Sequence, residues 1–307
     1  MDRFHRMAVY VAVAEEESFA GGARRLGMSP PAVTRAIASL EKHLGVKLLT
    51  RTTRFVRATD AGQRYLEQAR RIIAEADEAD EAVAGVNAAP RGRLAVTAPV
   101  LFGRMFVTPS IVEYLERFPG MSIAAAFLDR VVNLLEEGMD VGVRIGELRD
   151  SSMKAIGVGH VRRVVCAAPD YLKTRGMPRT PADLAKHTVI AANPASPSVD
   201  WKFTTDRKTT SVKLAPRLTV TSNEAAIVAA VQGFGVTRLL SYQVAAHLVS
   251  GELQAVLTDY EPPRLPINVL HSEGRQASAK VRTFVDLLVD RLRADKALNR
   301  SGARSAA

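Results

Sequence analysis

The chain has 307 residues, 47% of them hydrophobic and 24% charged, which is the composition of an ordinary globular protein long enough for about two domains. Its single cysteine, Cys166, excludes an intramolecular disulfide framework and favours a reducing compartment. No run approaches about 18 apolar residues, so we expect no membrane span, and the net charge of +10 indicates either anionic partners or simply a soluble surface.

Two short helices joined by a tight turn are predicted over residues 18–44. Gly27 ends the first helix, and Ser29 is placed to accept the free N–H groups of the second. The second helix carries an apolar stripe at helical spacing, formed by Val33, Ile37, Leu40 and Leu44. The turn needs a small residue four positions before its glycine and a branched apolar residue six positions after it. Ala23 and Val33 meet that spacing, which predicts a helix-turn-helix.

The charge of residues 21–57 points the same way. This segment holds one acid, Glu41, and eight basic residues, a net charge of +7: Arg24, Arg25, Arg35, Lys42, Lys47, Arg51, Arg54 and Arg57. Basic residues on a recognition helix and its wing neutralise DNA phosphates and release counterions. The alternative is a solvated basic face on an ordinary helical subdomain.

A long helix is predicted over residues 61–87, because this stretch holds no proline and few glycines. Apolar residues recur along it in alternating steps of four and three, a heptad seam formed by Tyr65, Ala69, Ile72, Ala76, Ala79, Val83 and Val86. Such a seam needs a partner, which is either a second copy of the chain or the chain's own C-terminal domain.

Strands and helices alternate in the C-terminal region. We expect strands at 94–97, 121–128 and 141–145, with helices at 109–117 and 131–137, and this order predicts parallel pairing and an α/β architecture. Residues 155–168 are predicted to cross to a second subdomain, and residues 267–271 to return to the first, followed by a final helix at 280–293.

Ligands of open α/β sheets bind beyond the carboxyl ends of strands, near helix N-termini. The candidate positions are 98–103, 129–130, 144–146 and 222–223. Ser222 and Asn223 are also good N-caps. Arg144 is equally able to pair with Asp140 or Glu147.

The N-terminal motifs resemble the winged domain of the LysR-type transcriptional regulators. The matching residues are Ser18-Phe19, Ala23, Leu26, Ser29, Pro31-Ala32-Val33-Thr34, Leu40-Glu41, Leu44-Gly45, Leu48, Arg51, Thr59 and Ala61-Gly62. Pro30 stands where the family usually has Gln, so a base-reading amide is missing. The resemblance implies that double-stranded DNA is contacted by Ser29, Pro30, Pro31, Thr34, Arg35, Arg51, Thr52, Thr53 and Arg54. It also implies that the long helix pairs two chains through Ile72, Ala76, Ala79 and Val83.

The C-terminal region is similar to the two-lobed effector domain of the same family, which has the fold of periplasmic binding proteins. The matching residues include Ala98-Pro99, Phe118-Pro119, Asp129-Arg130, Arg144-Ile145-Gly146, Trp201, Phe203 and Ser222-Asn223. The resemblance implies an effector site formed by Ala98, Pro99, Val100, Leu101, Phe102, Arg130, Arg144, Ser222 and Asn223. Because residues 98–102 are apolar and Arg144 is a cation, we expect a small, partly apolar carboxylate, although weak effector control remains an alternative.

The expected fold is therefore an α/β effector domain of two lobes, preceded by an all-α winged helix-turn-helix domain and a linker helix. The expected boundaries are 1–62 for the winged domain, 63–89 for the linker and 90–295 for the effector domain. Lobe I takes residues 90–162 and 267–295, lobe II takes 163–266, and residues 296–307 form a disordered tail.

The expected function is DNA-binding transcriptional regulation modulated by a small molecule. The rival classes are an α/β enzyme, for which we find no nucleophile elbow or phosphate loop, and a solute-binding protein, which leaves residues 1–86 unexplained. We expect no catalytic residues, metal or cofactor. The expected partners are double-stranded DNA, the effector and further copies of the chain in a dimer or homotetramer, with RNA polymerase as a further candidate. We expect no membrane association and a cytoplasmic location.

Overall fold

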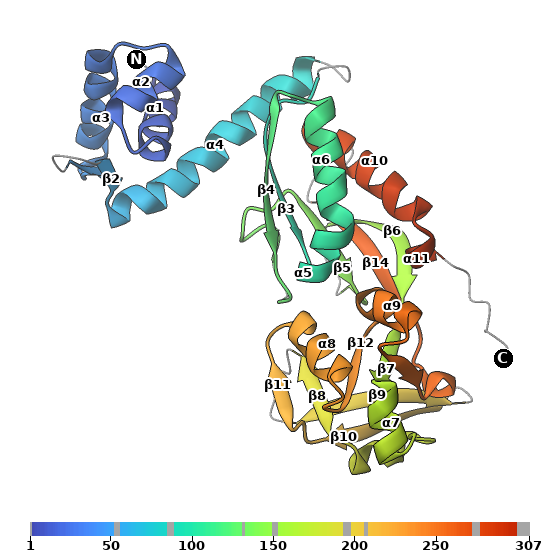
Figure 1. The fold of residues 1–307 in the computed structure, drawn as a ribbon. Coiled ribbons are helices and arrows are strands. Elements are labelled where there is room, and N and C mark those ends of the chain that lie inside the picture. The colour runs from blue at the N-terminus through green and yellow to red at the C-terminus, as the bar shows by residue number, and fades with distance from the viewer. Residues whose placement is uncertain are drawn as a thin grey trace. The chain divides into compact units, whose positions relative to one another are not determined.

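The computed structural model of the chain divides into two compact units, residues 1–88 and residues 89–307 (Figure 1). It describes residues 2–51, 56–84, 89–130, 133–148, 153–192, 198–205, 208–271 and 277–299.

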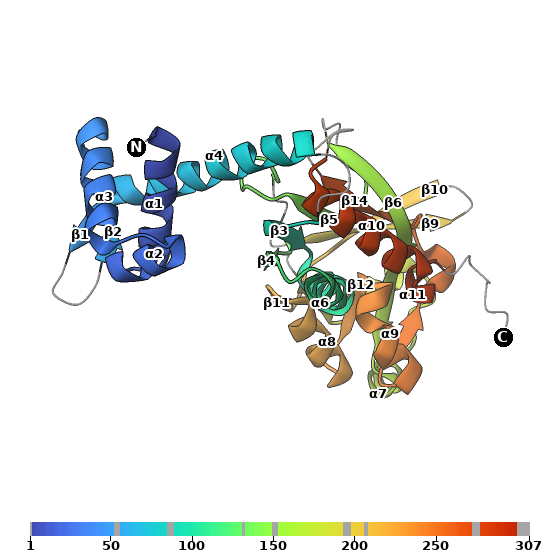
Figure 2. The same cartoon turned by 90° about the horizontal axis from the view of Figure 1, so that it is seen from above.

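The first unit is a small helical domain with a two-stranded wing. Its elements are α1 (Arg3–Glu15), α2 (Phe19–Leu26), α3 (Pro30–Leu44), β1 (Leu49–Arg51), β2 (Val56–Ala58) and α4 (Asp60–Ala84). Figure 2 shows α1, α2 and α3 gathered into one bundle. Helix α1 contacts α2, α3 and α4, and the core between them is formed by Val9, Tyr10, Val13, Ala23, Val33, Ala36, Ile37, Leu40, Leu48, Leu49 and Leu66. The domain therefore includes the start of the long helix.

Two glycines of this unit allow close backbone approaches. A Cβ atom on Gly22 would lie 2.7 Å from Cγ2 of Val13, so α2 can cross α1 closely only with glycine at this position. A Cβ atom on Gly62 would lie 2.1 Å from the carbonyl oxygen of Leu48, where α4 begins against the wing. The helix-propensity cost of Gly22 is thus offset by tight helix packing.

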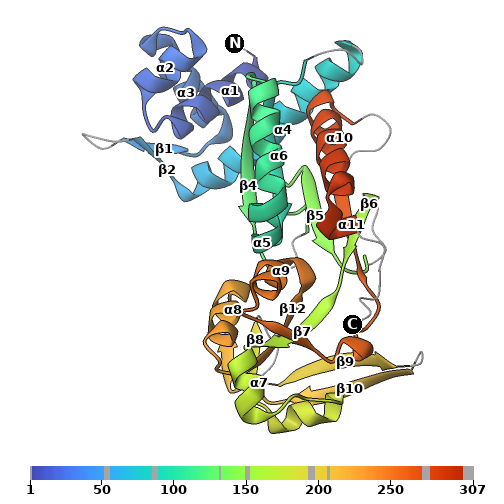
Figure 3. The same ribbon diagram turned by 45° about the vertical axis from the view of Figure 1, so that its right-hand side comes forward.

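Lobe I of the second unit is built on a mixed sheet. Its strands are β3 (Gly92–Ala98), β4 (Met121–Phe127), β5 (Val141–Ile145), β6 (Lys154–Val161) and β14 (Leu265–His271). Among the described residues, the order is β4-β3-β5-β14-β6, with β3 parallel to β4 and β5, and β14 antiparallel to β5 and β6. The predicted parallel pairing is confirmed for β3, β4 and β5. Helices α6 (Thr108–Arg117) and α10 (Ala279–Ala294) contact each other on this lobe (Figure 3).

The helical segment after β3 begins earlier than the sequence predicts. Asp129 accepts a hydrogen bond at 3.0 Å from the N–H of Val100, and α5 (Val100–Phe102) starts there. A π-helical stretch (Gly103–Val107) connects α5 to α6 without a break. Gly103 is required, because a Cβ atom there would lie 2.4 Å from the ring of Phe127.

The helix predicted over 131–137 is wrong for the part that the structure describes. Residues 134–138 form turns, and Asn133 is irregular. Gly138 closes this segment with a positive φ of 63°, and the N–H of Met139 bonds back to the carbonyl of Leu134. A left-handed glycine so close to the start ends a helix before it can extend.

The described residues of lobe II form a second mixed sheet and three helices. Its strands are β7 (Arg163–Ala167), β8 (Val189–Ala192), β11 (Leu218–Val220), β12 (Val236–Leu240) and β13 (Gln254–Val256), in the order β11-β8-β12-β7-β13 over the described residues. A separate hairpin pairs β9 (Val199–Thr205) with β10 (Lys208–Leu214). The helices are α7 (Pro169–Arg175), α8 (Asn223–Val231) and α9 (Ser241–Ser250), and two 3-10 segments lie at Pro181–Lys186 and Thr258–Tyr260.

The expectation of a disordered tail over 296–307 is wrong for its first four residues. They form α11 (Lys296–Asn299), which contacts β6 and α10. Leu298 is buried in the core of lobe I, and the side chain of Asn299 donates to the carbonyls of Leu292 and Asp295. Burial of Leu298 and the side-chain contacts of Asn299 fix this segment. Because the surrounding residues are polar, the sequence pattern alone did not indicate either contact. Residues 300–307 lie outside the described residues.

Candidate functional site

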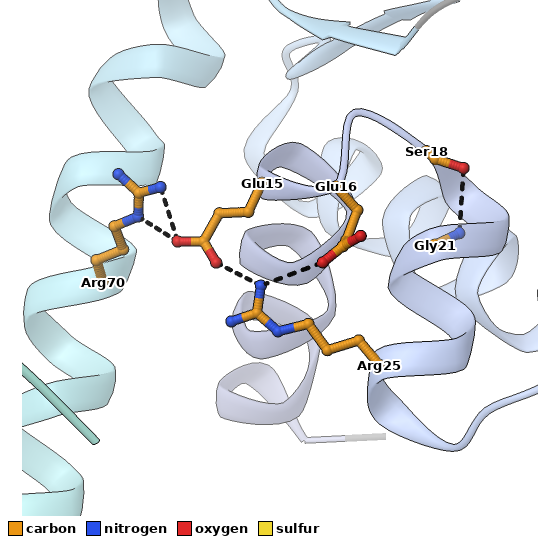
Figure 4. Close-up of polar contacts among 6 residues, drawn as sticks. All are labelled: Glu15, Glu16, Ser18, Gly21, Arg25 and Arg70. Carbon is orange, nitrogen blue, oxygen red and sulfur yellow. Dashed lines mark hydrogen bonds and ion pairs between the residues drawn. The ribbon is translucent and has the colours of Figure 1, made fainter. Parts of the chain in front are cut away.

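The turn between α2 and α3 has the geometry that its residue spacing predicts. Gly27 ends α2 with a left-handed φ of 62°, while Ala23 and Val33 are buried. At the start of α2, the side chain of Ser18 accepts a hydrogen bond at 3.1 Å from the N–H of Gly21 (Figure 4). Helix α3 is therefore held firmly against α2, with one side in the core.

The opposite side of α3 is exposed and suited to DNA. All five predicted contact residues of this helix and its N-terminus are exposed: Ser29, Pro30, Pro31, Thr34 and Arg35. Ser29 occupies the N-cap position, but its side chain makes no capping bond, which corrects the sequence expectation and leaves its hydroxyl outside the helix. Arg35 reaches back to the carbonyl oxygen of Pro31 at 3.4 Å, and Lys42 is also exposed two turns further along.

Glu41 connects the end of α3 to the wing. Its carboxylate accepts hydrogen bonds from the N–H groups of Leu48 and Leu49 at 2.9 and 3.2 Å, and from Nζ of Lys47 at 2.6 Å. Burial raises the pKa of Glu41, but the lysine and the two backbone donors outweigh it, so the pKa lies below its ordinary value. The wing therefore leaves α3 at a fixed angle. Thr52, Thr53 and Arg54 lie outside the described residues, and Arg51 is described only as backbone of β1.

A second carboxylate, Glu15, connects three helices (Figure 4). From the end of α1, it binds Arg25 of α2 at 2.6 Å and Arg70 of α4 at 2.7 Å. Burial raises the pKa of Glu15, but the two guanidinium groups outweigh this effect, so the pKa lies below its ordinary value. The first turns of α4 are thus joined to the winged domain.

The predicted seam of α4 divides into two parts. Tyr65 packs edge-on against Tyr10 with ring centroids 5.5 Å apart, and Ala69 is fully buried, so this part belongs to the core of the winged domain. Ile72 is 44% exposed and Ala76 is half-buried. Ala79 and Val83 continue the seam on α4, and their side chains lie outside what the structure describes.

A cavity of about 500 Å³ lies between the two lobes, a volume in the range of small-molecule sites. Lobe I contributes Pro99, Leu128, Asp129, Arg130, Arg144, Ile145 and Leu265 to its wall. Lobe II contributes Arg163, Ala192, Asn223, Arg238, Leu239, Leu240, Tyr242 and Gln243. Four arginines and one aspartate line this space, so the cavity favours an anion.

Only four of the predicted effector residues line this cavity: Pro99, Arg130, Arg144 and Asn223. Ala98, Leu101 and Phe102 are buried in the hydrophobic core instead. The reason is the early start of α5, which turns the apolar side chains of residues 101 and 102 inward. Val100 and Ser222 are absent from the cavity wall among the described residues, and Ser222 caps α8 by accepting a bond from the N–H of Ala225.

Two predicted residues connect the lobes or neighbouring segments. The side-chain amide of Asn223 donates to Asp129 at 3.1 Å, a hydrogen bond from lobe II to lobe I. Arg130 forms a bidentate pair with Glu137, with both contacts at 2.6 Å. Nη1 of Arg144 donates to the carbonyl oxygen of the neighbouring Val143 at 2.9 Å, and the Glu137 charge lies nearby.

The sequence analysis missed Arg163, Arg238, Tyr242 and Gln243. Arg163 begins β7 and Arg238 lies in β12, and the antiparallel register places them diagonally on one face of the sheet. No local motif marks either arginine: Arg163 follows Arg162 at the start of β7, and Arg238 lies between Thr237 and Leu239 in β12. The available signal was one cation within each of two mostly apolar strands.

Three further properties concern the described part of the chain. Within it, no group of three or more His, Cys, Asp or Glu side chains is arranged to hold a metal ion. No described helix combines the length and apolar character needed to cross a bilayer. Cys166 is buried, and burial raises the pKa of its thiol to about 12, which keeps it protonated.

Two family models match the chain. Residues 4–63 match the bacterial regulatory helix-turn-helix protein of the lysR family, and residues 87–293 match the LysR substrate binding domain. Together they cover both structural units.

Relatives and solved structures agree with these matches. An HTH-type transcriptional regulator of Haemophilus influenzae is 30% identical over 281 residues, which cover 92% of this chain and 98% of that protein. The regulator CrgA of Neisseria meningitidis is 29% identical over 287 residues, which cover 93% of this chain and 96% of that protein.

The solved structure of CrgA, described as a LysR-type transcriptional regulator, aligns over 94% of this chain and 98% of that chain, with a TM-score of 0.60 and 29% identity. A full-length variant of AphB aligns over 94% of this chain and 99% of that chain with a TM-score of 0.65, and at 23% identity this likeness concerns the fold. These matches cover one known domain arrangement, in which α3 and the wing are followed by a long helix and a two-lobed domain. The chain is therefore a member of the LysR family of DNA-binding transcriptional regulators.

Proposed function

We propose that this regulator reads double-stranded DNA with α3 and the wing, and that an effector in the cavity between the lobes changes that binding. The observation that supports DNA reading most directly is the exposed face of α3, where Pro31, Thr34, Arg35 and Lys42 follow one another at helical spacing. Thr34 and Arg35 lie one turn into the helix, at the depth from which side chains reach base edges in the major groove. Arg51, Thr52, Thr53 and Arg54 complete the proposed contact surface, with Arg54 entering the minor groove.

The effector site is proposed at the cavity shared by the lobes. Arg144 and Arg130 approach it from lobe I, and Asn223 from lobe II. A ligand that prefers one arrangement of the lobes shifts their population, and the shift is transmitted to the DNA-binding half. The function thus requires one site that contacts both lobes, which this cavity provides.

Self-association is proposed through the outer part of α4. Ile72 is exposed and Ala76 only half-buried within a single chain, and together with Ala79 and Val83 they continue a heptad seam. Pairing of these seams would give a dimer, and contacts between effector domains would complete a homotetramer. RNA polymerase is a proposed further partner, and the cytoplasm, where operator DNA is found, is the proposed location.

The test is DNA binding by the full chain. Duplexes are first selected by the wild-type protein from a random library, and affinities for selected and scrambled duplexes are then measured at fixed salt. Arg35→Ala is expected to cost about 1–3 kcal/mol on selected duplexes and to relax the preference over scrambled ones. Arg175→Ala removes one positive charge from an exposed site in the other unit and is the matched control. Full specificity in Arg35→Ala would refute the assignment of α3 as the reading helix.

A further inference from the structure

Two arginines of lobe II lie side by side on the wall of the cavity. Arg163 pairs across the strands with Leu240, and Arg238 pairs with Val165, so the two arginines are diagonal neighbours on one face of the sheet. Diagonal Cβ atoms in such a register are about 7–8 Å apart. Both side chains are half-buried, and each guanidinium is within electrostatic reach of the other.

These two cations lack a matching pair of anions. Among the described residues, the side chain of Arg163 has no hydrogen-bond or ion-pair partner, and burial lowers its pKa. Arg238 lies over the ring of Trp201 at 4.9 Å and donates to the carbonyl of Lys202 at 3.2 Å, and the Asp200 charge offsets only part of its cost. Burial, with the Arg163 charge added, lowers the pKa of Arg238 to about 10, so it remains charged at neutral pH. A repelling, half-buried pair of this kind is costly unless a bound anion compensates it.

Lobe I offers cationic groups at the opposite wall. Arg130 is paired with Glu137 through two contacts, and Arg144 of β5 lines the cavity beside it. Burial lowers the pKa of Arg144, and the Glu137 charge offsets this in part. Apolar side chains line the space between the two walls, among them Ile145, Leu239 and Leu265.

We propose that the effector is a small dicarboxylate with an apolar middle, one carboxylate bound by Arg163 and Arg238 and the other by Arg144. This inference rests on the proposed function of the cavity and adds the chemical class of its ligand. It replaces the expectation of a single carboxylate with an apolar body against residues 98–102, because most of that segment lies in the core and the cavity has arginines on both walls. A ligand with charges at both ends also explains control of the lobes, since its length fixes their separation.

The experiment uses the full chain and a series of linear diacids from succinate to pimelate. Each diacid is compared with the monoacid of equal length in a thermal-shift assay and by calorimetry. We expect at least one diacid to raise Tm by several degrees at about a hundredfold excess over its Kd, and its monoacid to bind about tenfold or more weakly. Equal binding of a diacid and its monoacid, or no Tm change with any diacid, would overturn the proposal.

Three variants distinguish a ligand role from a structural one. Arg163→Gln is expected to raise the Tm of the free protein, because it removes an uncompensated charge, and to abolish the preference for diacid over monoacid. Arg144→Gln, in the other lobe, is expected to abolish the same preference. Arg175→Gln, exposed in lobe II, is the control and should change neither. If Arg163→Gln lowers the Tm of the free protein and leaves the diacid preference intact, the arginine serves the fold and the proposal is wrong.

A phosphate group is the other chemical class that carries two negative charges, and inorganic phosphate and glycerol phosphate are used as probes for it. Binding of these probes that depends on Arg163 and not on Arg144 would assign a phosphate site to lobe II and overturn the bridging dicarboxylate. DNA binding is measured in parallel. If a diacid binds but leaves the affinity for selected duplexes unchanged, the ligand class stands and the effector role of the cavity fails.

Discussion

At the scale of single residues, two carboxylates, Glu41 buried and Glu15 half-buried, fix the geometry of the winged domain. Glu41 fastens the wing to the end of α3 through two backbone N–H groups and Lys47. Glu15 fastens α2 and α4 to α1 through two arginines. Since each bond involves an ionised group, these contacts are stronger than neutral hydrogen bonds and depend on pH.

The Glu15 contacts give a prediction about acid stability. Because the folded-state pKa of Glu15 lies below its ordinary value of 4.5, its contribution is fully present above that value and is lost as pH falls through the folded pKa. Glu15→Gln is expected to cost about 1–3 kcal/mol at pH 7 and to lose less stability than the wild type on acidification. The measurement is urea unfolding of the full chain, followed by circular dichroism at several pH values.

Glu16→Gln is the matched control. Glu16 is 3.9 Å from Arg25 and its side chain is 43% exposed, so this change should be nearly neutral. Equal losses in the two variants would show that general charge, and not the connection of three helices, determines the stability.

At the scale of elements, α4 has two successive roles along one helix. Its first turns complete the core of the winged domain through Leu66 and Ala69. Beyond Arg70 the apolar stripe leaves that core, and Ile72 is exposed in the single chain. The stripe is continuous in sequence, and only the packing shows where one role ends.

The outer seam of α4 gives a prediction about assembly. Ala76→Glu is expected to abolish dimerisation through this helix and to weaken operator binding, because it places a charge in the seam. Light scattering and duplex binding are the measurements. Gln68→Glu adds the same charge at an exposed position of α4 and should leave mass and affinity unchanged. Retention of the wild-type mass by Ala76→Glu would mean that the seam packs elsewhere.

The winged domain was predictable because its signals are local. The spacing of Ala23, Gly27 and Val33, all within one turn and its flanking helices, is sufficient to predict the helix-turn-helix. The cavity depends on register instead. Arg163 and Arg238 are separated by most of lobe II in sequence and meet only because β7 pairs with β12. The apolar residues 101 and 102 are suited either to a ligand site or to a core. Because α5 begins at Val100, their side chains are buried in the core.

At the scale of the effector domain, one aromatic residue joins the lobes. Tyr242 of α9 lies edge-on against Phe102 and Phe106 of lobe I, with ring centroids 5.4 and 5.8 Å away. It is 3% exposed, and burial raises the pKa of its hydroxyl. The core cluster around it extends through both lobes, so movement between the lobes must repack these rings.

Tyr242 therefore gives a prediction about coupling between the lobes. Tyr242→Ala is expected to cost about 3–5 kcal/mol and to increase hydrogen exchange in both α9 and the segment 102–107. Tyr242→Phe keeps the ring and loses only the 3.3 Å contact from Gln243, so it should remain within about 1 kcal/mol of the wild type. Exchange that increases in α9 alone would show that the ring stabilises its own helix and does not couple the lobes.

Because the ion pair of Glu15 and Arg70 joins α4 to the winged domain, a rotation of α4 also moves α3, the proposed recognition helix. Because the first turns of α4 are joined to the winged domain, rotation of α4 about the proposed pairing point at Ile72 would carry α3 with it. The twelve residue-to-residue steps from Asp60 to Ile72 correspond to about 18 Å of helix, so a rotation of roughly 10° displaces the start of α4 by about 3 Å. That displacement is close to the axial rise of one base pair, about 3.4 Å. In a dimer paired through α4, a small change of crossing angle would therefore alter the spacing of two half-sites by about one base step.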